Sequence, residues 1–219
     1  MGDSAVATGD MQTAAETGGQ TKPAYAFQNL TSDPLLAQAP RIVFHGVQRP
    51  ALGGIPLLAK IGQGGMGAVY YGLHPVMGVA VAVKVLPLDL VGHNPDMARR
   101  FVREAQIAGS INSANLIYVR DVGQDAGYFY QVMEYVRGLS AGAYLDLTRK
   151  NGRVGLRETE ALKICIAAAK GLAAAHAQSI IHRDVKPDNI LIPTVGETKK
   201  LQFPAAKLAD LGLEQFTFV

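Results

Sequence analysis

The order of local patterns along the chain is the strongest constraint on its fold. From 55 to about 136 the sequence consists of short β-rich runs separated by glycine-containing turns: IPLLAKIG, AVYYG, VAVAVKVL, LIYVRDVG and YFYQVMEYV. Such runs predict strands. After Gly138 the pattern turns helical, and two short strand-like runs, NILI and KLAD, follow near the end. Strands grouped before helices are typical of an α+β fold, here a small β-rich lobe followed by the beginning of a helical one.

Two segments have the apolar period of an amphipathic helix. The first, HNPDMARRFVREAQIAGSI, interrupts the strands, with Asn94 as the expected N-cap and Pro95 at the first helical position. We expect it to lie against the sheet through Phe101, Ala105, Ala108 and Ile111. The second helix is expected from about Glu158 to Gln178, and its apolar face should comprise Leu162, Cys165, Ile166, Ala169, Leu172, Ala173 and His176. Cys165 and His176 are therefore interpreted as packing residues.

The first 40 residues differ in composition from the rest of the chain. They are rich in Ala, Thr, Gly, Ser and Gln and have no sustained apolar period, so they are expected to form a disordered tail. We therefore divide the chain into a tail at 1–40, a β-rich lobe at 41–136 and a partial helical lobe at 137–219.

Composition narrows the classes of partner and the compartment. The chain of 219 residues has a net charge of only +3, with Lys and Arg scattered, which argues against nucleic acid as a partner. Cys165 is the single cysteine, so no intramolecular disulfide can form, as suits a reducing compartment. The first residues lack the pattern of a secretory signal, and no apolar stretch is long enough for a membrane span. We expect a cytoplasmic protein.

Gly62, Gly64 and Gly67 form a G-x-G-x-x-G pattern in IGQGGMGAVY. A dinucleotide site, as in an oxidoreductase, would need a helix directly after these glycines, so that the pyrophosphate meets a helix N-terminus. The following residues, AVYY, favour a strand instead. The glycines are therefore expected at the tip of a hairpin whose backbone N–H groups can cover phosphates, although a merely flexible turn remains an alternative.

The strand VAVAVKVL places a lysine beside small side chains. Period-two geometry sends Val79, Val81, Val83 and Val85 to one face and Ala80, Ala82, Lys84 and Leu86 to the other. The second face would let a flat ring approach the sheet while the ammonium of Lys84 reaches phosphates; a lysine snorkelling at a sheet edge is the alternative. Glu104 lies near the apolar face of the first helix, and a carboxylate there needs a partner, for which Lys84 is the natural candidate.

The stretch IIHRDVKPDNILI has the most specific chemistry. Asp184 and Asn189 flank a proline-containing loop, with Lys186 between them. This loop supplies a carboxylate that can accept a hydroxyl proton, a cation for a transferring phosphoryl group and an amide oxygen for Mg²⁺. At the end of the KLAD strand, Asp210 precedes a glycine turn and offers a second metal ligand.

The ordered set GQGGMGAV, VAVK, a helical Glu104, HRDVKPDN and ADLG resembles the eukaryotic-like protein kinases, most of all their bacterial serine/threonine branch. The resemblance runs from about Ile55 to Gly212. It implies a kinase-like α+β fold with a complete β-rich N-lobe and an only partly present helical C-lobe, and transfer of the γ-phosphate of ATP to a protein Ser or Thr hydroxyl.

The resemblance also implies a role for individual residues. Adenine would lie between Ile61, Val69, Ala82 and Leu191, with its edge on the backbone of Glu134 and Val136 behind Met133 as gatekeeper, and with Gly62, Gly64 and Gly67 over the phosphates. Lys84 would hold the α and β phosphates and pair with Glu104. Asp184 would orient the acceptor hydroxyl and take its proton, Lys186 would steady the γ-phosphate, and Asn189 and Asp210 would bind Mg²⁺. His182 is interpreted as structural.

Three departures from the family qualify these expectations. Leu211 stands where many kinases have Phe, a change that keeps the metal-binding carboxylate. The connection between Asn189 and Asp210 is unusually long and is expected to form an extended hairpin. After Gly212 the family continues through an activation segment, an Ala-Pro-Glu anchor and further helices, and none of these is present in the sequence. A second hypothesis is therefore an ATP-binding but catalytically incompetent fragment that acts as an interaction module, because the flank of the second helix would be partly uncovered.

Overall fold

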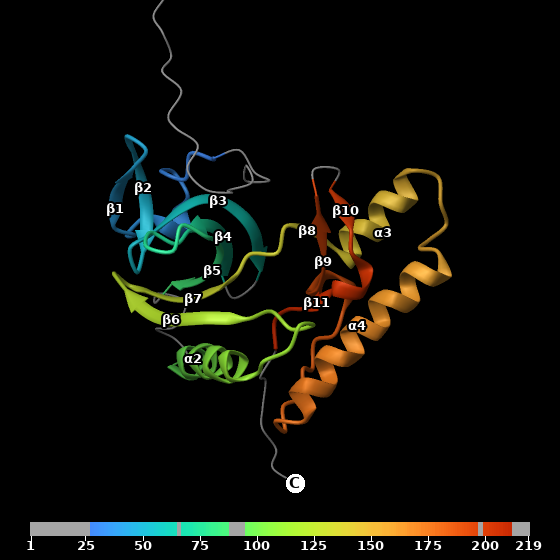
Figure 1. Cartoon of the computed structure of the whole chain (residues 1–219). Coiled ribbons are helices and arrows are strands. Elements are labelled where there is room, and N and C mark those ends of the chain that lie inside the picture. Colours follow the sequence, from blue (N-terminus) through green and yellow to red (C-terminus); the bar gives the residue numbers. More distant parts are fainter. Residues whose placement is uncertain (1–26, 65–66, 88–94, 197–198, 212–219) are drawn as a thin grey trace, which may run out of the picture.

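A computed structural model describes residues 27–64, 67–87, 95–196 and 199–211, and arranges them in two lobes side by side (Figure 1). The first lobe is built on a sheet of seven antiparallel strands in the order β1-β2-β3-β4-β5-β7-β6. Its strands are β1 (Arg41–Phe44), β2 (Val47–Leu52), β3 (Ile55–Gly64), β4 (Gly67–Leu73), β5 (Ala80–Pro87), β6 (Val119–Asp125) and β7 (Tyr128–Glu134). The kinase-like fold with a β-rich first lobe is thus confirmed.

The two faces of β5 differ as the sequence predicts, except at Val79. Val81, Val83 and Val85 are at most 1% exposed and belong to the main core of the first lobe, whereas Lys84 is partly exposed on the other face. Val79, expected on the valine face, is 39% exposed because it precedes β5. Helix α2 (Pro95–Ser110) packs beside β6 and β7, and Phe101 on it packs with Leu86 of β5. The expected N-cap, Asn94, lies outside the described residues.

The prediction of a disordered tail at 1–40 is wrong for residues 27–40. Residues 27–40 pack on the sheet, and a 3-10 turn, η1 (Pro34–Leu36), begins after Asp33. Leu30 and Leu36 are only 5% and 0% exposed within the core of the first lobe. These isolated leucines bury enough apolar surface to offset ordering of the segment, although they form no periodic pattern. Residues 1–26 of the predicted tail lie outside the described residues.

The second lobe combines helices with a small sheet. It contains β8 (Gly138–Ser140), α3 (Ala141–Lys150), α4 (Glu158–His176), η2 (Pro187–Asn189), β9 (Ile190–Val195), β10 (Lys200–Leu201), η3 (Phe203–Ala205) and β11 (Lys207–Leu208). The expected hairpin after Asn189 is present, because β9 pairs antiparallel with β10. Other residues of β9 pair with β11 and with β8. Within the described ranges, no helix combines the length and apolarity needed to span a bilayer.

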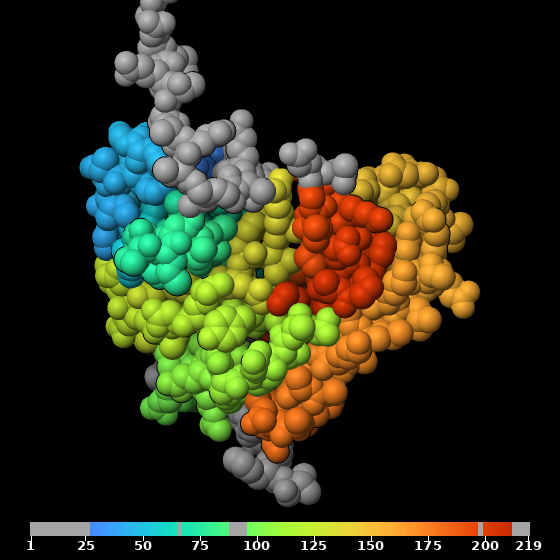
Figure 2. All heavy atoms as spheres, viewed as in Figure 1, coloured from blue at the N-terminus to red at the C-terminus, as the bar shows by residue number. Residues whose placement is uncertain are grey.

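The predicted buried face of α4 is wrong. The core of the second lobe instead takes Ile164, Ala167, Ala168, Gly171 and Ala175. Gly171 sits against the backbone of Asn115, and a Cβ at this position would come within 2.5 Å of its carbonyl oxygen. Helix α4 runs along the outer border of the lobe (Figures 1 and 2). Most of the predicted face is solvent-exposed: Leu162 is 57% and Ile166 47% exposed, and Cys165, Ala169, Ala173 and His176 are exposed as well, whereas Leu172 packs partly buried against the core.

Glu160 joins the first turn of α4 to α3. Its carboxylate accepts hydrogen bonds from the Arg157 backbone N–H at 2.9 Å, from Arg153 at 2.9 Å and from the Tyr144 hydroxyl at 3.1 Å. Burial alone would raise the pKa of Glu160, but these three hydrogen bonds outweigh it and leave the pKa below its ordinary value. The charged form of Glu160 therefore stabilises the folded lobe.

We expect Glu160→Gln to lower the free energy of unfolding by about 1–3 kcal/mol at neutral pH, because it weakens charge-assisted bonds to a buried acceptor. Since the folded-state pKa is depressed, this contribution is present above the unfolded pKa of about 4.3 and is lost as pH falls through the folded value. Urea unfolding across that pH range measures it. Asp146→Asn, which removes an exposed ion pair to Arg149 on α3, is the control; equal effects of the two variants would contradict the assignment.

Candidate functional site

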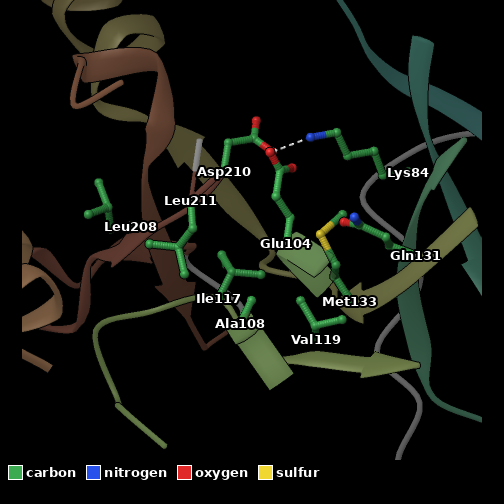
Figure 3. A pocket seen from close by; sticks show the side chains of 10 residues that line it. All are labelled: Lys84, Glu104, Ala108, Ile117, Val119, Gln131, Met133, Leu208, Asp210 and Leu211. Carbon is green, nitrogen blue, oxygen red and sulfur yellow. Dashed lines mark hydrogen bonds and ion pairs between the residues drawn. The ribbon is translucent and has the colours of Figure 1, made fainter. Parts of the chain in front are cut away.

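Side chains from both lobes surround one pocket at the lobe boundary. Lys84 comes from β5, Glu104 from α2 and Met133 from β7, and Asp210 follows β11. Figure 3 shows the polar ends of Lys84, Glu104 and Asp210 directed toward a common space. The structure therefore brings together four of the residues that the sequence singled out, from segments as far apart as β5 and β11.

Lys84 and Asp210 form an ion pair across this boundary. The Lys84 Nζ lies 2.8 Å from Asp210 Oδ1, and the two side chains are 19% and 48% exposed. Strand pairing sets the position of Lys84, because it stands opposite Val69 on one neighbouring strand and Gln131 on the other. Glu104 shares the pocket with both charges, and its predicted ion pair with Lys84 stays a prediction.

The loop before β9 holds Asp184, Lys186 and Asn189 in one hydrogen-bonded group. Lys186 Nζ donates to Asp184 Oδ2 at 2.7 Å, and Asn189 Nδ2 donates to the same oxygen at 2.9 Å and to the Asp184 carbonyl at 2.8 Å. The Lys186 ammonium, supported by Asn189, holds the pKa of the Asp184 carboxyl below its usual range. Asp184 is consequently a carboxylate at neutral pH, in position to accept a hydrogen bond from a hydroxyl group.

His182 ties this loop to the segment that carries Asp210. The ring is 1% exposed; its Nδ1 accepts from the Asp184 backbone N–H at 3.3 Å, so Nε2 is the nitrogen that donates to the Ala209 carbonyl at 2.9 Å. Arg183 and Asp210, each next to one of these bonds, have positive φ angles of 63° and 55°. Non-glycine residues in this region of backbone space are strained, and such strain concentrates at functional sites. The interpretation of His182 as structural agrees with these contacts.

The residues present fit a magnesium ion that is shared with phosphates. Asn189 uses its amide nitrogen on Asp184, which leaves Oδ1 as the oxygen for a cation. Asp210 adds a half-exposed carboxylate. Among the described residues no three His, Cys, Asp or Glu side chains cluster as a metal site. Mg²⁺ keeps several waters and takes only one or two protein carboxylates, so an amide oxygen and one carboxylate suit it.

The predicted adenine residues share one side of the first lobe. Val69 stands opposite Lys84, and Ala82 stands opposite Met133, so these four side chains lie on the same sheet face. Ile61 packs with the small cluster that includes Tyr71, which is the partner of Ala82 on β4. Leu191 is partly buried on β9 of the second lobe, and Val136 lies partly buried between β7 and β8. Their contact with a nucleotide stays a prediction.

Glu134 has a role that its sequence context did not indicate. Its Oε1 accepts from Lys207 Nζ at 2.8 Å and from the Tyr118 backbone N–H at 2.8 Å, so the side chain links β7 to β11. The side chain is therefore engaged within the protein, and any contact with a nucleotide is left to the Glu134 backbone.

The glycine pattern lies on a hairpin, as predicted. Gly64 stands opposite Gly67, and β4 begins at Gly67, so no helix follows the glycines directly; residues 65 and 66 lie outside the described ranges. Gly67 has φ 128°, and a Cβ there would lie 2.0 Å from the Val85 carbonyl oxygen, so only glycine fits. A dinucleotide-dependent oxidoreductase is excluded by the criterion set out above.

Sequence reasoning did not predict the remaining lining of the pocket. It comprises five apolar residues and one polar residue, from α2, from β6 and the segment before it, from β7 and from the segment around β11: Ala108, Ile117, Val119, Leu208, Leu211 and Gln131. Gln131, which faces Lys84 across the strands, donates from Nε2 to the Phe101 carbonyl at 2.7 Å and so joins β7 to α2. A buried polar residue in the strand YFYQVMEYV is the signal that could have indicated this link.

A curled β-sheet lobe with a glycine hairpin, facing a second lobe with an Asp-Lys-Asn loop, defines the protein kinase class of fold. A family model described as the protein kinase domain matches residues 56–217, and the chain belongs to this family. The end of that match, from Gly212 on, lies outside the described residues.

Bacterial proteins of similar sequence carry the name serine/threonine-protein kinase and support the assignment of the chain to that branch of the family. The chain is 39% identical over 150 residues to the serine/threonine-protein kinase PrkC of Bacillus subtilis, with 68% of this chain and 22% of the relative covered. It is 36% identical over 167 residues to the serine/threonine-protein kinase Pkn1 of Myxococcus xanthus, with 74% and 23% covered. The chain thus spans less than a quarter of the length of these relatives.

A solved structure gives the same result for the fold. The crystal structure of the Mycobacterium tuberculosis PknI kinase domain matches with a TM-score of 0.61 and 28% sequence identity, over 75% of this chain and 62% of the other. The chain is therefore a member of the serine/threonine protein kinase family that aligns with little more than half of a kinase domain.

Proposed function

We propose that this chain binds Mg-ATP at the lobe boundary and supplies the catalytic loop for transfer of the γ-phosphate to a Ser or Thr hydroxyl of a protein. The observation that carries the proposal is the ion pair between Lys84 and Asp210, because it brings a cation for phosphates and a carboxylate for Mg²⁺ to one point. The family relation supports the same reaction. Since ATP and a reducing environment both suit the cytoplasm, we also propose a cytoplasmic location.

Each polar residue has a distinct part in this reaction. Lys84 exchanges Asp210 for the α and β phosphates, and Glu104, in the same pocket, orients its ammonium. Asn189 and Asp210 hold Mg²⁺, which neutralises phosphate charge when it is bound. Asp184, kept ionised by Lys186, accepts a hydrogen bond from the substrate hydroxyl and receives its proton. Lys186 then stabilises negative charge on the transferring group.

The nucleotide site has two further groups. We propose that Ile61, Val69, Ala82 and Leu191 enclose adenine, with Met133 behind it and the backbone of Glu134 and Val136 at its edge. Gly62, Gly64 and Gly67 cover the phosphates. One observation supports this: β4, the second strand of the glycine hairpin, pairs directly with β5, which carries Lys84.

A second function, as an interaction module, is favoured by the surface of α4. Leu162 and Ile166 expose 57% and 47% of their surface on one helix face, beside the exposed Cys165. Apolar faces of this kind promote association. The two functions differ in turnover: a catalytically incompetent fragment would bind nucleotide without transferring phosphate.

Nucleotide binding predicts a thermal shift. At a hundred times its dissociation constant, Mg-ATP should add about 2.7 kcal/mol to the free energy of unfolding of the wild-type chain. Lys84→Ala and Asp210→Ala should abolish most of the shift, because they remove the phosphate and metal contacts. Lys163→Ala, on the exposed side of α4, is the matched control and should keep it. A wild-type melting temperature that does not respond to Mg-ATP would disprove the assembled site.

Catalysis predicts transfer of labelled phosphate. Incubation of the chain with γ-labelled Mg-ATP and a generic basic protein should label Ser and Thr of that protein, and Asp184→Asn should lower the rate by about 10²-fold or more, in line with loss of a general base. Lys186→Ala should also slow the reaction. If wild-type and Asp184→Asn chains both bind Mg-ATP but label no protein, the interaction-module function replaces the kinase function.

A further inference from the structure

The strand that leads into the glycine hairpin has little support from the sheet on its outer side. β3 pairs with β2 only at Ile55 and Pro56, whereas it pairs with β4 from Leu57 to Gly64. Beyond Pro56, its outward backbone groups would be open to water. Residues 27–40, which we call the N-terminal strap, occupy this side, and they lie before the segment that matches the kinase family at 56–217.

Gln28 in the strap completes the hydrogen bonding of β3. Its backbone N–H donates to the Leu58 carbonyl at 2.8 Å, and its side-chain Oε1 accepts from the Lys60 N–H at 3.0 Å. Leu58 and Lys60 are alternate residues, so both groups lie on the same edge of the strand. Gln28 therefore satisfies the outer edge of β3 at these two residues, just before the glycine pattern begins at Gly62.

Asp33 in the strap bridges β3 and β4 from behind. Its Oδ2 accepts from the Tyr70 hydroxyl at 2.9 Å and lies 3.3 Å from Lys60 Nζ, while Oδ1 accepts from the Leu35 N–H at 3.0 Å. The Asp33 side chain is only 7% exposed. Lys60 and Tyr70 are direct partners across the two strands, so a single carboxylate holds both sides of the hairpin.

The two residues that Asp33 holds are neighbours of predicted adenine contacts. Lys60 precedes Ile61, and Tyr70 follows Val69. Successive side chains of a strand point to opposite faces, so Tyr70 faces the core and the strap while Val69 faces Lys84. Because Ile61 and Val69 are on the same two strands, a shift of the hairpin at Lys60 and Tyr70 would also move the proposed nucleotide face.

The strap itself is fixed by packing. Leu36 is fully buried and Leu30 nearly so, and both belong to the core that contains Tyr70 and Val83. The Gln38 N–H also donates to the Tyr128 hydroxyl at 3.0 Å. Burial of Tyr70, with the hydrogen bond to Asp33 added to it, raises the pKa of its hydroxyl, which therefore stays a donor at all ordinary pH values. The Asp33 carboxylate thus acts on the hairpin from a rigid base.

We propose that Asp33 is a positioning residue for nucleotide binding, which acts through Lys60 and Tyr70 to set the height of the glycine hairpin over the phosphates. The inference rests on the proposed function, because it concerns the same nucleotide. The strap, which precedes the family match, would thus support the ATP site without contacting ATP itself.

Two measurements on the full chain test this role. The first is hydrogen–deuterium exchange of peptides that cover 61–70 in the absence of nucleotide, and the second is the dissociation constant of Mg-ATP, measured well below the melting temperature. Asp33→Asn should speed exchange in those peptides and weaken Mg-ATP by about fivefold, which corresponds to about 1 kcal/mol, the order of one ordinary hydrogen bond. Tyr70→Phe, which removes one bond and keeps the packing, should shift both readouts in the same direction by a smaller factor.

Asp125→Asn is the matched control. Asp125 also holds a turn next to β3, since its Oδ2 accepts from the Gly53 N–H at 2.9 Å, but at the end of the strand away from the glycines. It should leave exchange at 61–70 and Mg-ATP affinity unchanged even if it lowers the melting temperature. A merely structural carboxylate at Asp33 would behave in the same way.

The outcomes separate the inference from the proposed function. If the wild-type chain binds Mg-ATP and Asp33→Asn and Tyr70→Phe bind it as tightly, with exchange at 61–70 unchanged, the positioning role of Asp33 is wrong and the proposed function stands. If the wild-type chain does not bind Mg-ATP at all, the proposed function fails, and the positioning role fails with it. If Asp33→Asn does not fold, weaker binding by Tyr70→Phe supports the role and equal binding overturns it.

Discussion

The contact between the Lys84 ammonium and the Asp210 carboxylate is the interaction on which the site depends. It joins β5 of the first lobe to the segment after β11, and both side chains keep access to water. A partly exposed pair of this kind stabilises a protein by only about 0–1 kcal/mol. Phosphates and Mg²⁺ can therefore replace it at little cost, and the pair keeps the two charges close together until they do.

Contacts from both lobes hold the segment that carries Asp210 in place. The His182 ring bonds the Ala209 carbonyl and the Asp184 N–H, so the segments that carry Asp210 and Asp184 share one buried support. Glu134 adds a second link, since it binds Lys207 on the strand before Asp210. Both supports use side chains within the family match, whereas the strap supports the hairpin from outside it.

Local patterns predicted the parts of the structure that depend on local geometry. The alternation in VAVAVKVL was sufficient to predict which residues of β5 face the core, and the order of the motifs was sufficient to predict the family. The buried face of α4 could not be predicted in this way, because Leu162 and Ile166 are apolar yet exposed, whereas Gly171, which has no Cβ, permits the close approach of the Asn115 backbone. The small residues Ala167 and Ala168 lie in the core of the second lobe. The strap was missed because Leu30 and Leu36 are separate apolar residues in a polar segment, and only tertiary packing makes them core.

One face of α4 stays exposed in the described part of the second lobe. The chain aligns with 62% of the PknI kinase domain, and Leu162 and Ile166 are about half exposed. The residues proposed to bind Mg-ATP are among the described residues, and none of them lies on this exposed face.

A crystal structure of the chain with Mg²⁺ and a non-hydrolysable ATP analogue tests the account most directly. The account predicts that the metal contacts Asn189 Oδ1 and Asp210, and that Lys84 Nζ has left its position 2.8 Å from Asp210 Oδ1 to bind the phosphates. An analogue bound elsewhere, or bound between the lobes with the Lys84–Asp210 pair intact and no metal on Asn189, would contradict it.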